Sequence, residues 1–313
     1  MPEKKIIAVV GATGAQGGGL VRAILEDPSG EFTARAITRD PNSDKAKALA
    51  KLGAEVVKGD VDDPESLKKA FEGAYGAFCV TFFWNHYSPE RETENAKTQA
   101  EATKAAGVKH VIWSTLEDTR KHVPLDDNRM PTIGGNYKVP HFDAKGQADE
   151  FFKDVPATLL LTTFFWDNFI HFGSGPARGE DGNLYLTFPL ADKKMAGIAS
   201  EDIGRAALGI FKRPDLIGKT VGVAGEHLTG EQMAKGISKA IGQPVTYRAV
   251  EPDAYRALGF PGAEDLGNMF QYYRDFENHF GQTRDVDFAR SVNPKLLSFD
   301  QWLDKYGNQI RVP

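Results

Sequence analysis

The sequence predicts an α/β fold in which a doubly wound parallel sheet is joined to a smaller, partly interwoven C-terminal α/β domain. Short apolar runs alternate with amphipathic helical segments from residue 5 to residue 163, which is the pattern of successive βαβ units. The crossovers of such units are right-handed, so the sheet is expected to carry helices on both faces.

The expected strands are short and apolar, as buried parallel strands are. They span residues 5–11, 32–38, 54–60, 75–81, 109–115 and 157–163. The segments between them carry helix start and stop signals. Ser43 is a suitable cap and Gly53 a suitable end for one helix, and Asp63 is a suitable cap for the next, with Pro64 at its first position. The expected helices span residues 15–27, 43–53, 63–73, 90–107 and 144–154.

The alternation loosens after about residue 165. Glycine-rich short strands are expected within 172–188, and two helices within 199–214 and 229–242. Ser200 resembles the start of a capping box, and Thr229 is a suitable cap for the second helix. We expect a first domain at residues 1–165, to which some later segments return, and a smaller substrate- or partner-side domain at 166–313.

Charge and hydropathy exclude several classes of protein. The net charge is −5 and no run of five basic residues occurs, which argues against direct binding to nucleic acid or to anionic membranes. No window approaches the ~18 apolar residues of a membrane span, and the apolar stretch near the N-terminus is too short for a signal-peptide core. A cytoplasmic location is therefore expected.

The single cysteine, Cys79, excludes an intramolecular disulfide and a cysteine-based metal cluster. It lies in the apolar run "AFCVTFF", so we expect a buried, unreactive thiol. The histidines do not pair with acidic residues at metal-ligand spacing, so no metal site is predicted.

The stretch "GATGAQG" places Gly11, Gly14 and Gly17 directly between the first strand and the first helix. This spacing permits a tight turn, a close approach of backbone to a pyrophosphate, and close packing of the helix on the strand. The free N–H groups of the helix N-terminus then face the phosphates. The pattern in this context predicts a Rossmann-type dinucleotide site.

The end of the second strand, "AITRDP", indicates which dinucleotide binds. Arg39 suits a 2′-phosphate through charge and paired hydrogen bonds, with Lys45 and Thr13 as candidates to assist, so NADP(H) is favoured. Asp40 is the argument for NAD, because an acid at this point binds the ribose hydroxyls. After the third strand, Asp60 either accepts from the adenine amino group or only forms a turn, and both interpretations stay open.

With these residues, the chain resembles the NmrA-like family, atypical members of the short-chain dehydrogenase/reductase superfamily, and in particular those described as NADP(H) sensors. Isoflavone reductase-like enzymes are more distantly similar. The C-terminal half is similar in layout rather than in motif. The motifs occur in order between about residues 6 and 170, and they are "GATGAQG", "AITRD", "GAEVVKGDVDD", "VTFFW", "KHVIWSTLED", "HFDAKGQADEFF" and "TTFFWDNF".

This resemblance implies that the first domain binds NADP(H) and that a cleft faces the smaller domain. It also implies a role for individual residues. Gly11, Thr13, Gly14, Gln16 and Gly17 would cradle the pyrophosphate, Arg39 would hold the 2′-phosphate, Asp60 would flank adenine, Thr81, Phe82 and Phe83 would line the cofactor, Lys145 would contact the nicotinamide ribose, and Asn168 would face the cleft floor.

Ordinary reductases of the superfamily carry Tyr-x-x-x-Lys, in which the tyrosine delivers a proton. Here "PHFDAKG" has His141 four residues before Lys145, on the same helix face. Histidine can act as a general acid, but a nearby lysine cation favours its neutral form. His141 is therefore either a proton donor or a helix-start residue without chemistry. Pro140 argues against a continuous helix from Tyr137 through His141.

Ser114, at the end of the fifth strand, remains available to polarise a substrate carbonyl. Ser114, His141 and Lys145 are the candidate catalytic residues. Aromatic residues crowd the expected cleft and form either an apolar substrate pocket or core: Phe82, Phe83, Trp84, Phe164, Phe165, Trp166 and Phe169. The segment 270–280 is expected as an aromatic helix that packs on the sheet domain, with a lid or partner surface as the alternative.

The complete cofactor loop without the tyrosine favours a redox sensor that binds NADP(H) and acts on a regulatory protein partner. The alternative is an NADPH-dependent reductase of a small apolar substrate, aromatic or unsaturated. The oligomeric state stays open.

Overall fold

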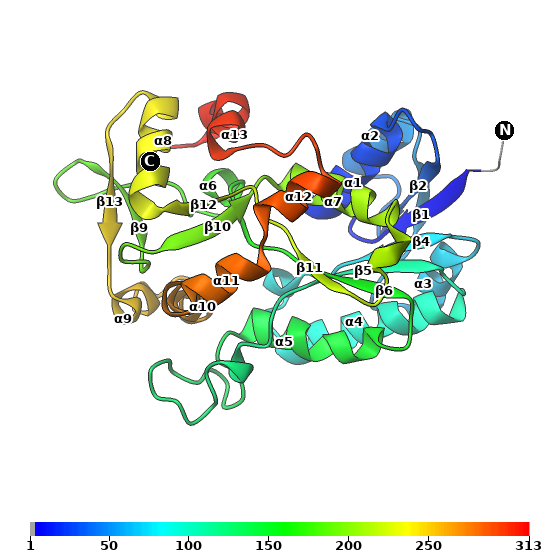
Figure 1. The fold of residues 1–313 in the computed structure, drawn as a ribbon, viewed down its shortest axis with the longest axis horizontal. Coiled ribbons are helices and arrows are strands. Elements are labelled where there is room, and N and C mark those ends of the chain that lie inside the picture. The colour runs from blue at the N-terminus through cyan, green and yellow to red at the C-terminus, as the bar shows by residue number, and fades with distance from the viewer. Residues whose placement is uncertain (1–3, 313) are drawn as a thin grey trace.

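The protein is described here by a computed structural model of residues 4–312, and its centre is a seven-stranded sheet (Figure 1). Every pair of neighbouring strands in this sheet is parallel. The strand order places β1 between β2 and β4, which is the switch point of a Rossmann-type sheet. Across the sheet, the strands are β3 (Glu55–Lys58), β2 (Phe32–Thr38), β1 (Lys5–Val9), β4 (Gly76–Cys79), β5 (His110–Thr115), β6 (Ala157–Leu161) and β11 (Thr220–Gly222).

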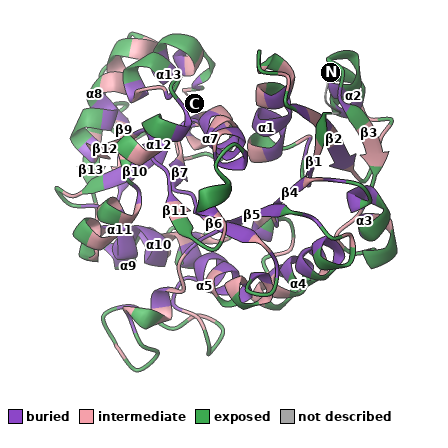
Figure 2. Ribbon diagram, turned by 45° about the vertical axis from the view of Figure 1, so that its right-hand side comes forward, coloured by how far each residue is buried: buried purple, intermediate pink, exposed green. Residues whose placement is uncertain are grey.

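Helices cover both faces of this sheet, and its central strands β4 and β5 are buried along their whole length, whereas the edge strands β3 and β11 are partly exposed (Figures 1 and 2). One face carries α1 (Ala15–Glu26), α2 (Asp44–Lys51) and α7 (Ser200–Phe211). The other face carries α3 (Pro64–Phe71), α4 (Pro89–Ala105) and α5 (Pro140–Ala148). The predicted doubly wound α/β fold is confirmed.

The second part of the chain forms two small sheets and further helices. One sheet has the order β12 (Glu226–Thr229), β10 (Lys194–Ile198), β7 (Phe164–Phe165), and the other β13 (Val245–Ala249), β9 (Leu184–Phe188), β8 (Ala177–Arg178). The helices are α6 (Asn168–His171), α8 (Gly230–Ile241), α9 (Pro252–Arg256), α10 (Ala263–Asp275), α11 (Glu277–Thr283), α12 (Val286–Val292) and α13 (Phe299–Tyr306).

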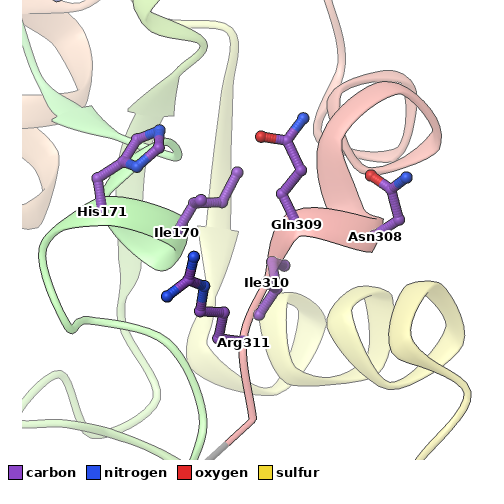
Figure 3. A pocket seen from close by; sticks show the side chains of 6 residues that line it. All are labelled: Ile170, His171, Asn308, Gln309, Ile310 and Arg311. Atoms are coloured by element: carbon purple, nitrogen blue, oxygen red, sulfur yellow. The ribbon is translucent and has the colours of Figure 1, made fainter.

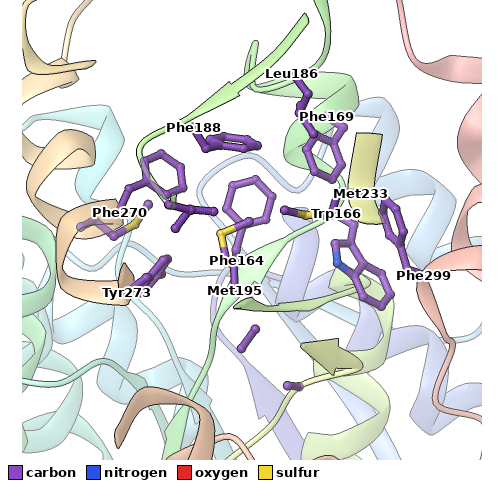
Figure 4. Packing of buried hydrophobic residues seen from close by; sticks show 14 of the residues in the cluster. Phe164, Trp166, Phe169, Leu186, Phe188, Met195, Met233, Phe270, Tyr273 and Phe299 are labelled. Atoms are coloured by element: carbon purple, nitrogen blue, oxygen red, sulfur yellow. The ribbon is translucent and has the colours of Figure 1, made fainter. Parts of the chain in front are cut away.

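These elements enclose a core that is separate from the two cores flanking the central sheet. Phe164, Trp166 and Phe169, which the sequence left between pocket and core, are packed in it with Phe188 and Phe270 (Figure 4). The two parts are interwoven, because β11 returns to the central sheet from residues 220–222. The boundary at residue 165 remains a prediction.

Local signals placed most helix starts correctly. The side chains of Ser43 and Asp63 cap α2 and α3, and Thr229 forms a complete capping box with Gln232. Ser200 was wrongly expected as a cap. It is the first helical residue of α7, and Ala199 occupies the capping position without a side-chain hydrogen bond.

Both ends of α5 differ from those of the helix expected here. α5 begins at Pro140 and ends at Ala148, followed by a 3₁₀ turn at Asp149–Phe152, whereas a helix over 144–154 was expected. Proline suits a first helical position because its missing N–H has no partner there. His141 and Lys145 therefore share one helix, and that helix does not extend back to Tyr137.

The aromatic segment 270–280 is split between α10 and α11, with Phe276 between them, rather than forming one helix. The core of the second part of the chain buries four aromatic residues of this segment: Phe270, Tyr272, Tyr273 and Phe280. The segment is therefore packed rather than an exposed lid, but it packs mainly in the core of the second part of the chain and meets the sheet domain through Phe142 of α5.

Candidate functional site

The glycine-rich turn lies at the carboxyl end of β1, at the switch point of the sheet. Gly11 has a φ of +65°, a conformation that L side chains rarely adopt, and its carbonyl accepts from the N–H of Gly14 at 2.9 Å. A Cβ on Gly17 would lie 2.5 Å from the Gly11 carbonyl oxygen. Gly14 precedes α1 and brings no side-chain cap, so the first-turn amides are available to an anion.

The next glycines serve helix packing. A Cβ on Gly19 would lie 3.2 Å from the Glu201 backbone of α7, and one on Gly204 would lie 2.1 Å from the Leu20 nitrogen. These glycines let α1 and α7 cross at close range. Gly19 is therefore explained by its close approach to α7, whereas a Cβ on Gly18 would lie 3.1 Å from the Ala12 carbonyl oxygen of the turn.

Arg39 is exposed and forms no hydrogen bond or ion pair with any residue between 4 and 312. Lys45, at the start of α2, is likewise exposed and without such a partner in the described chain. Asp40 is engaged locally, because its Oδ1 accepts from the Asn42 amide at 2.9 Å. The cations at this strand end are free to bind a ligand, whereas the carboxylate stabilises its own turn.

Asp60 also forms a turn. Its Oδ1 accepts from the Asp62 amide at 3.1 Å, and its backbone pairs with Asp63. These contacts account for Asp60 without a ligand, so a contact with adenine stays a prediction.

Lys145 is the centre of a buried polar network on the other side of the switch point. Its Nζ donates to Thr81 Oγ1 at 2.7 Å and to the Ser114 carbonyl at 3.3 Å, and it pairs with Glu92 Oε1 at 3.2 Å. Thr81 in turn donates to Glu92 Oε1 at 2.5 Å. The lysine is thus held at the carboxyl ends of β4 and β5.

Glu92 was not singled out from the sequence. It lies in α4 among other acidic residues, and only the packing of α4 shows that its side chain is fully buried. Its second oxygen has no hydrogen bond among the described residues and lies 3.5 Å from Nε2 of His86. A buried carboxylate therefore compensates the charge of Lys145.

Ser114 connects this network to the glycine loop. Its hydroxyl donates to Gln16 Oε1 at 2.8 Å, although the two residues are 98 positions apart. Thr13 lies half-buried in the same loop. The structure thus brings the predicted pyrophosphate residues and the predicted catalytic serine together.

His141 contacts the segment that follows β4. Its ring lies 4.8 Å from Trp84 and 5.8 Å from Phe83 between ring centroids. Its Nδ1 lies 2.6 Å from Oδ1 of Asp265 in α10, a residue that sequence analysis missed because it is 124 positions away. The nearest charged partner of the ring is therefore a carboxylate, not Lys145.

The remaining predicted cofactor residues, Phe82, Phe83 and Asn168, differ in their exposure and in their surroundings. Phe82 is 52% exposed beside the network, whereas Phe83 is buried. Asn168 starts α6, and its side chain makes no hydrogen bond within residues 4–312. Its helix borders a cavity of about 540 Å³, together with the chain end at 308–311 (Figure 3). None of the predicted cofactor residues lines that cavity, and the role of Asn168 stays a prediction.

Cys79 is fully buried, and burial raises the pKa of its thiol, as expected for an unreactive residue. No group of three potential metal ligands is found among residues 4–312. No helix of the described chain is long and apolar enough to cross a membrane.

Asp149 follows α5 and binds β5, the strand that ends at this network. The burial of its carboxyl group predicts a measurable pH dependence of stability. Its Oδ1 accepts from Thr115 at 2.6 Å and from the Trp113 indole at 2.9 Å, yet burial raises its pKa from 3.8 to about 6. Between these pH values the folded state binds more protons at this site than the unfolded chain. The contribution of Asp149 to the unfolding free energy therefore falls as pH rises.

Asp149→Asn keeps the acceptor oxygen and removes the charge. We expect the variant to exceed the wild type in unfolding free energy above pH 6 by up to about 3 kcal/mol, and to match it near pH 3.5. Urea unfolding across this pH range measures the difference. Asp154→Asn is the control, because that side chain is 80% exposed. A gain that is the same at all pH values would contradict the assignment.

The parallel sheet and the glycine turn at its switch point define a Rossmann-type fold. The profile of the NmrA-like family matches residues 3–303, and the chain belongs to this family. An NmrA-like family domain-containing oxidoreductase of Aspergillus versicolor, notA', is 43% identical over 90% of this chain and 80% of its own length.

Two solved structures have the same fold. NmrA, described as a negative transcriptional regulator, in complex with NADP, superposes with a TM-score of 0.74 at 22% identity, over 98% of this chain and 95% of that one. The Citrobacter sp. triphenylmethane reductase complexed with NADP(H) superposes with a TM-score of 0.71 at 20% identity, over 96% of this chain and 99% of that one.

Proposed function

We propose that this protein binds NADP(H) across the carboxyl ends of β1, β2, β4 and β5 and uses it as a reductase. The observation that carries the cofactor assignment is the pairing of an uncapped helix N-terminus with Arg39, which has no partner among residues 4–312. The first suits the pyrophosphate, and the second suits the 2′-phosphate that distinguishes NADP from NAD. The NADP complexes of the two structural neighbours support this proposal.

The reductase assignment is supported by the arrangement of three side chains. Ser114 and Lys145 meet at the end of β5, and His141 and Lys145 both contact the segment 81–84 from one face of α5. The bound cofactor would supply hydride. Lys145 would hold the ribose, Ser114 would orient a substrate oxygen, and His141 would handle a proton. The relative from Aspergillus versicolor carries the name oxidoreductase, which agrees.

A regulatory role is the second candidate, favoured by the ion pair between Glu92 and Lys145. In the ordinary reductases of the superfamily, the lysine cation lowers the pKa of the catalytic tyrosine, whereas here the tyrosine is absent and the lysine is paired with Glu92. The fold of NmrA, a transcriptional regulator, agrees with this candidate.

Turnover separates the two candidates. A reductase oxidises NADPH in the presence of a quinone, enone or aldehyde, and loses this activity in Lys145→Ala. A sensor shows no turnover but distinguishes NADPH from NADP⁺ in affinity, because a ligand pair bound equally well shifts no equilibrium. Equal affinities together with no turnover would contradict both.

Arg39→Ala is expected to weaken NADPH binding by about 10- to 100-fold and to leave NADH binding unchanged. In the proposed complex the guanidinium would contact only the 2′-phosphate, which NADH lacks. Fluorescence titrations of both proteins with both nucleotides under one set of conditions measure the effect. Arg290→Ala is the control, since Arg290 is equally exposed on α12. An equal loss for both nucleotides would place Arg39 elsewhere in the site.

A further inference from the structure

A carboxylate from the second part of the chain completes the environment of His141. Oδ1 of Asp265 lies 2.6 Å from His141 Nδ1, and Oδ2 accepts from the His141 backbone N–H at 3.2 Å. The side chains of both residues are 8% exposed. One carboxylate thus holds the ring and also caps the first turn of α5, whose own capping residue, Val139, offers no side-chain acceptor.

This geometry determines where the ring carries its hydrogen. An ionised carboxylate can only accept hydrogen bonds, so Nδ1 must be the protonated nitrogen. Nε2 has no hydrogen-bond partner among residues 4–312, and it is not among their enclosed unpartnered atoms. The rings of Phe83, Trp84 and Phe142 surround the imidazole at 4.8–5.8 Å between centroids. The free nitrogen is therefore presented from a largely apolar enclosure.

We propose that Asp265 is a positioning residue that makes His141 Nε2 the proton donor to the substrate oxygen. The inference rests on the proposed reductase function. The substrate class is a carbonyl compound or a quinone, whose carbon or ring takes hydride and whose oxygen takes one proton. His141 begins as the doubly protonated ring and gives up the Nε2 proton. The Nδ1 proton stays in its hydrogen bond with Asp265, so the neutral ring remains in place.

Two hydride acceptors that differ in whether their reduction consumes a proton provide a chemical control for the proton-donor role. Reduction of the quinone menadione consumes one hydride and one proton. Reduction of crystal violet, a triphenylmethane cation, consumes one hydride and no proton, because hydride neutralises the cationic carbon. A residue that only donates a proton affects the first reaction and spares the second.

Asp265→Asn is the informative variant because of the backbone contact. The His141 amide can only donate, so the oxygen of the new carboxamide pairs with it and the NH₂ group faces Nδ1. An NH₂ group donates to an unprotonated Nδ1, which forces the hydrogen onto Nε2. The variant therefore keeps the shape of the contact and reverses the tautomer of the neutral ring. Because the NH₂ group cannot accept from a protonated Nδ1, the variant also disfavours the doubly protonated ring that donates the proton.

The matched control is Asn268→Ala, one turn further along α10. Asn268 is fully buried, and its Nδ2 donates to the carbonyls of Pro131 and Lys138, so it also joins α10 to the segment before α5. None of the hydrogen bonds of its side chain among the described residues involves His141. A purely structural role of Asp265 would make the two variants behave alike.

The first readout needs no turnover. Long-range ¹H–¹⁵N spectra of histidine-labelled protein, assigned with His141→Gln, report the tautomer of the neutral ring. We expect the Nδ1–H form in the wild type and in Asn268→Ala, and the Nε2–H form in Asp265→Asn. An Nε2–H ring in the wild type would overturn the inference whatever the activity.

The second readout compares NADPH oxidation with the two acceptors. We expect Asp265→Asn and His141→Gln to lower kcat with menadione by about 10²- to 10⁴-fold and to leave kcat with crystal violet within about threefold. Equal losses with both acceptors would overturn the proton-donor role. Wild-type protein that shows the Nδ1–H ring but reduces neither acceptor would contradict the reductase function and with it this donor role, while the ring contact itself would stand.

Discussion

Gly17→Ala is expected to reduce NADPH affinity by at least about 100-fold, equivalent to about 2.7 kcal/mol. The new Cβ would lie 2.5 and 2.7 Å from the carbonyl oxygen and carbon of Gly11, and 2.8 Å from the carbonyl oxygen of Val10. These are backbone atoms of the strand end and the turn, and they cannot move aside as a side chain can. The turn must shift away from α1, which separates the loop amides from the helix N-terminus that together bind the pyrophosphate.

The same displacement should lower the unfolding free energy by about 1–3 kcal/mol, as overpacking does. Isothermal titration with NADPH and urea unfolding of the same samples measure the two effects. Gly281→Ala is the control, because a Cβ there meets only the His227 ring at 3.5 Å, an ordinary contact. Unchanged NADPH affinity in a folded Gly17→Ala protein would contradict the assignment of this turn to the pyrophosphate.

Lys145→Met is expected to lower the unfolding free energy by about 3–5 kcal/mol, the usual effect of breaking a buried ion pair. The substitution leaves the fully buried carboxylate of Glu92 with one side-chain hydrogen bond in the described chain, the one that it accepts from the Thr81 hydroxyl. A buried carboxylate without its cation is strongly disfavoured by desolvation. Urea unfolding at pH 7 measures the loss.

The double variant Lys145→Met, Glu92→Gln tests the cause. Removal of the second charge leaves no buried ion, and the carboxamide oxygen still accepts from Thr81. We expect the double variant to be more stable than Lys145→Met alone, with a coupling free energy of about 1–3 kcal/mol in the double-mutant cycle. Additive losses would show that the two residues do not act as a pair.

Much of the fold is predictable because its signals are local. A buried parallel strand must be apolar along its whole length, and the helices between such strands begin and end at residues with specific capping chemistry. The six strands expected up to residue 163 are all present, and the side chains of Ser43, Asp63 and Thr229 form the expected caps. The helix at 144–154 was misplaced because Pro140 is both a possible end of the preceding segment and a suitable first helical residue.

The residues of the candidate site also fall into two groups: those that local sequence signals reveal and those that only the structure reveals. Gly11, Gly14 and Gly17 are recognisable because their spacing is enforced by the backbone of a single turn. Glu92 and Asp265 are not recognisable, because nothing in their neighbouring residues distinguishes them from the exposed acids beside them, such as Glu90 and Glu264. Their significance comes from burial and from the cations and rings that other elements bring to them.

The sequence by itself determined the parallel α/β sheet, the glycine turn at its first strand and the four-residue spacing of His141 and Lys145, since each depends on contiguous residues. Only the tertiary structure decided how these groups are charged and oriented. It pairs Lys145 with Glu92 from α4 and His141 with Asp265 from α10. The physical reason is that electrostatic interactions in a protein depend on distance and burial, and both arise only when distant segments pack together.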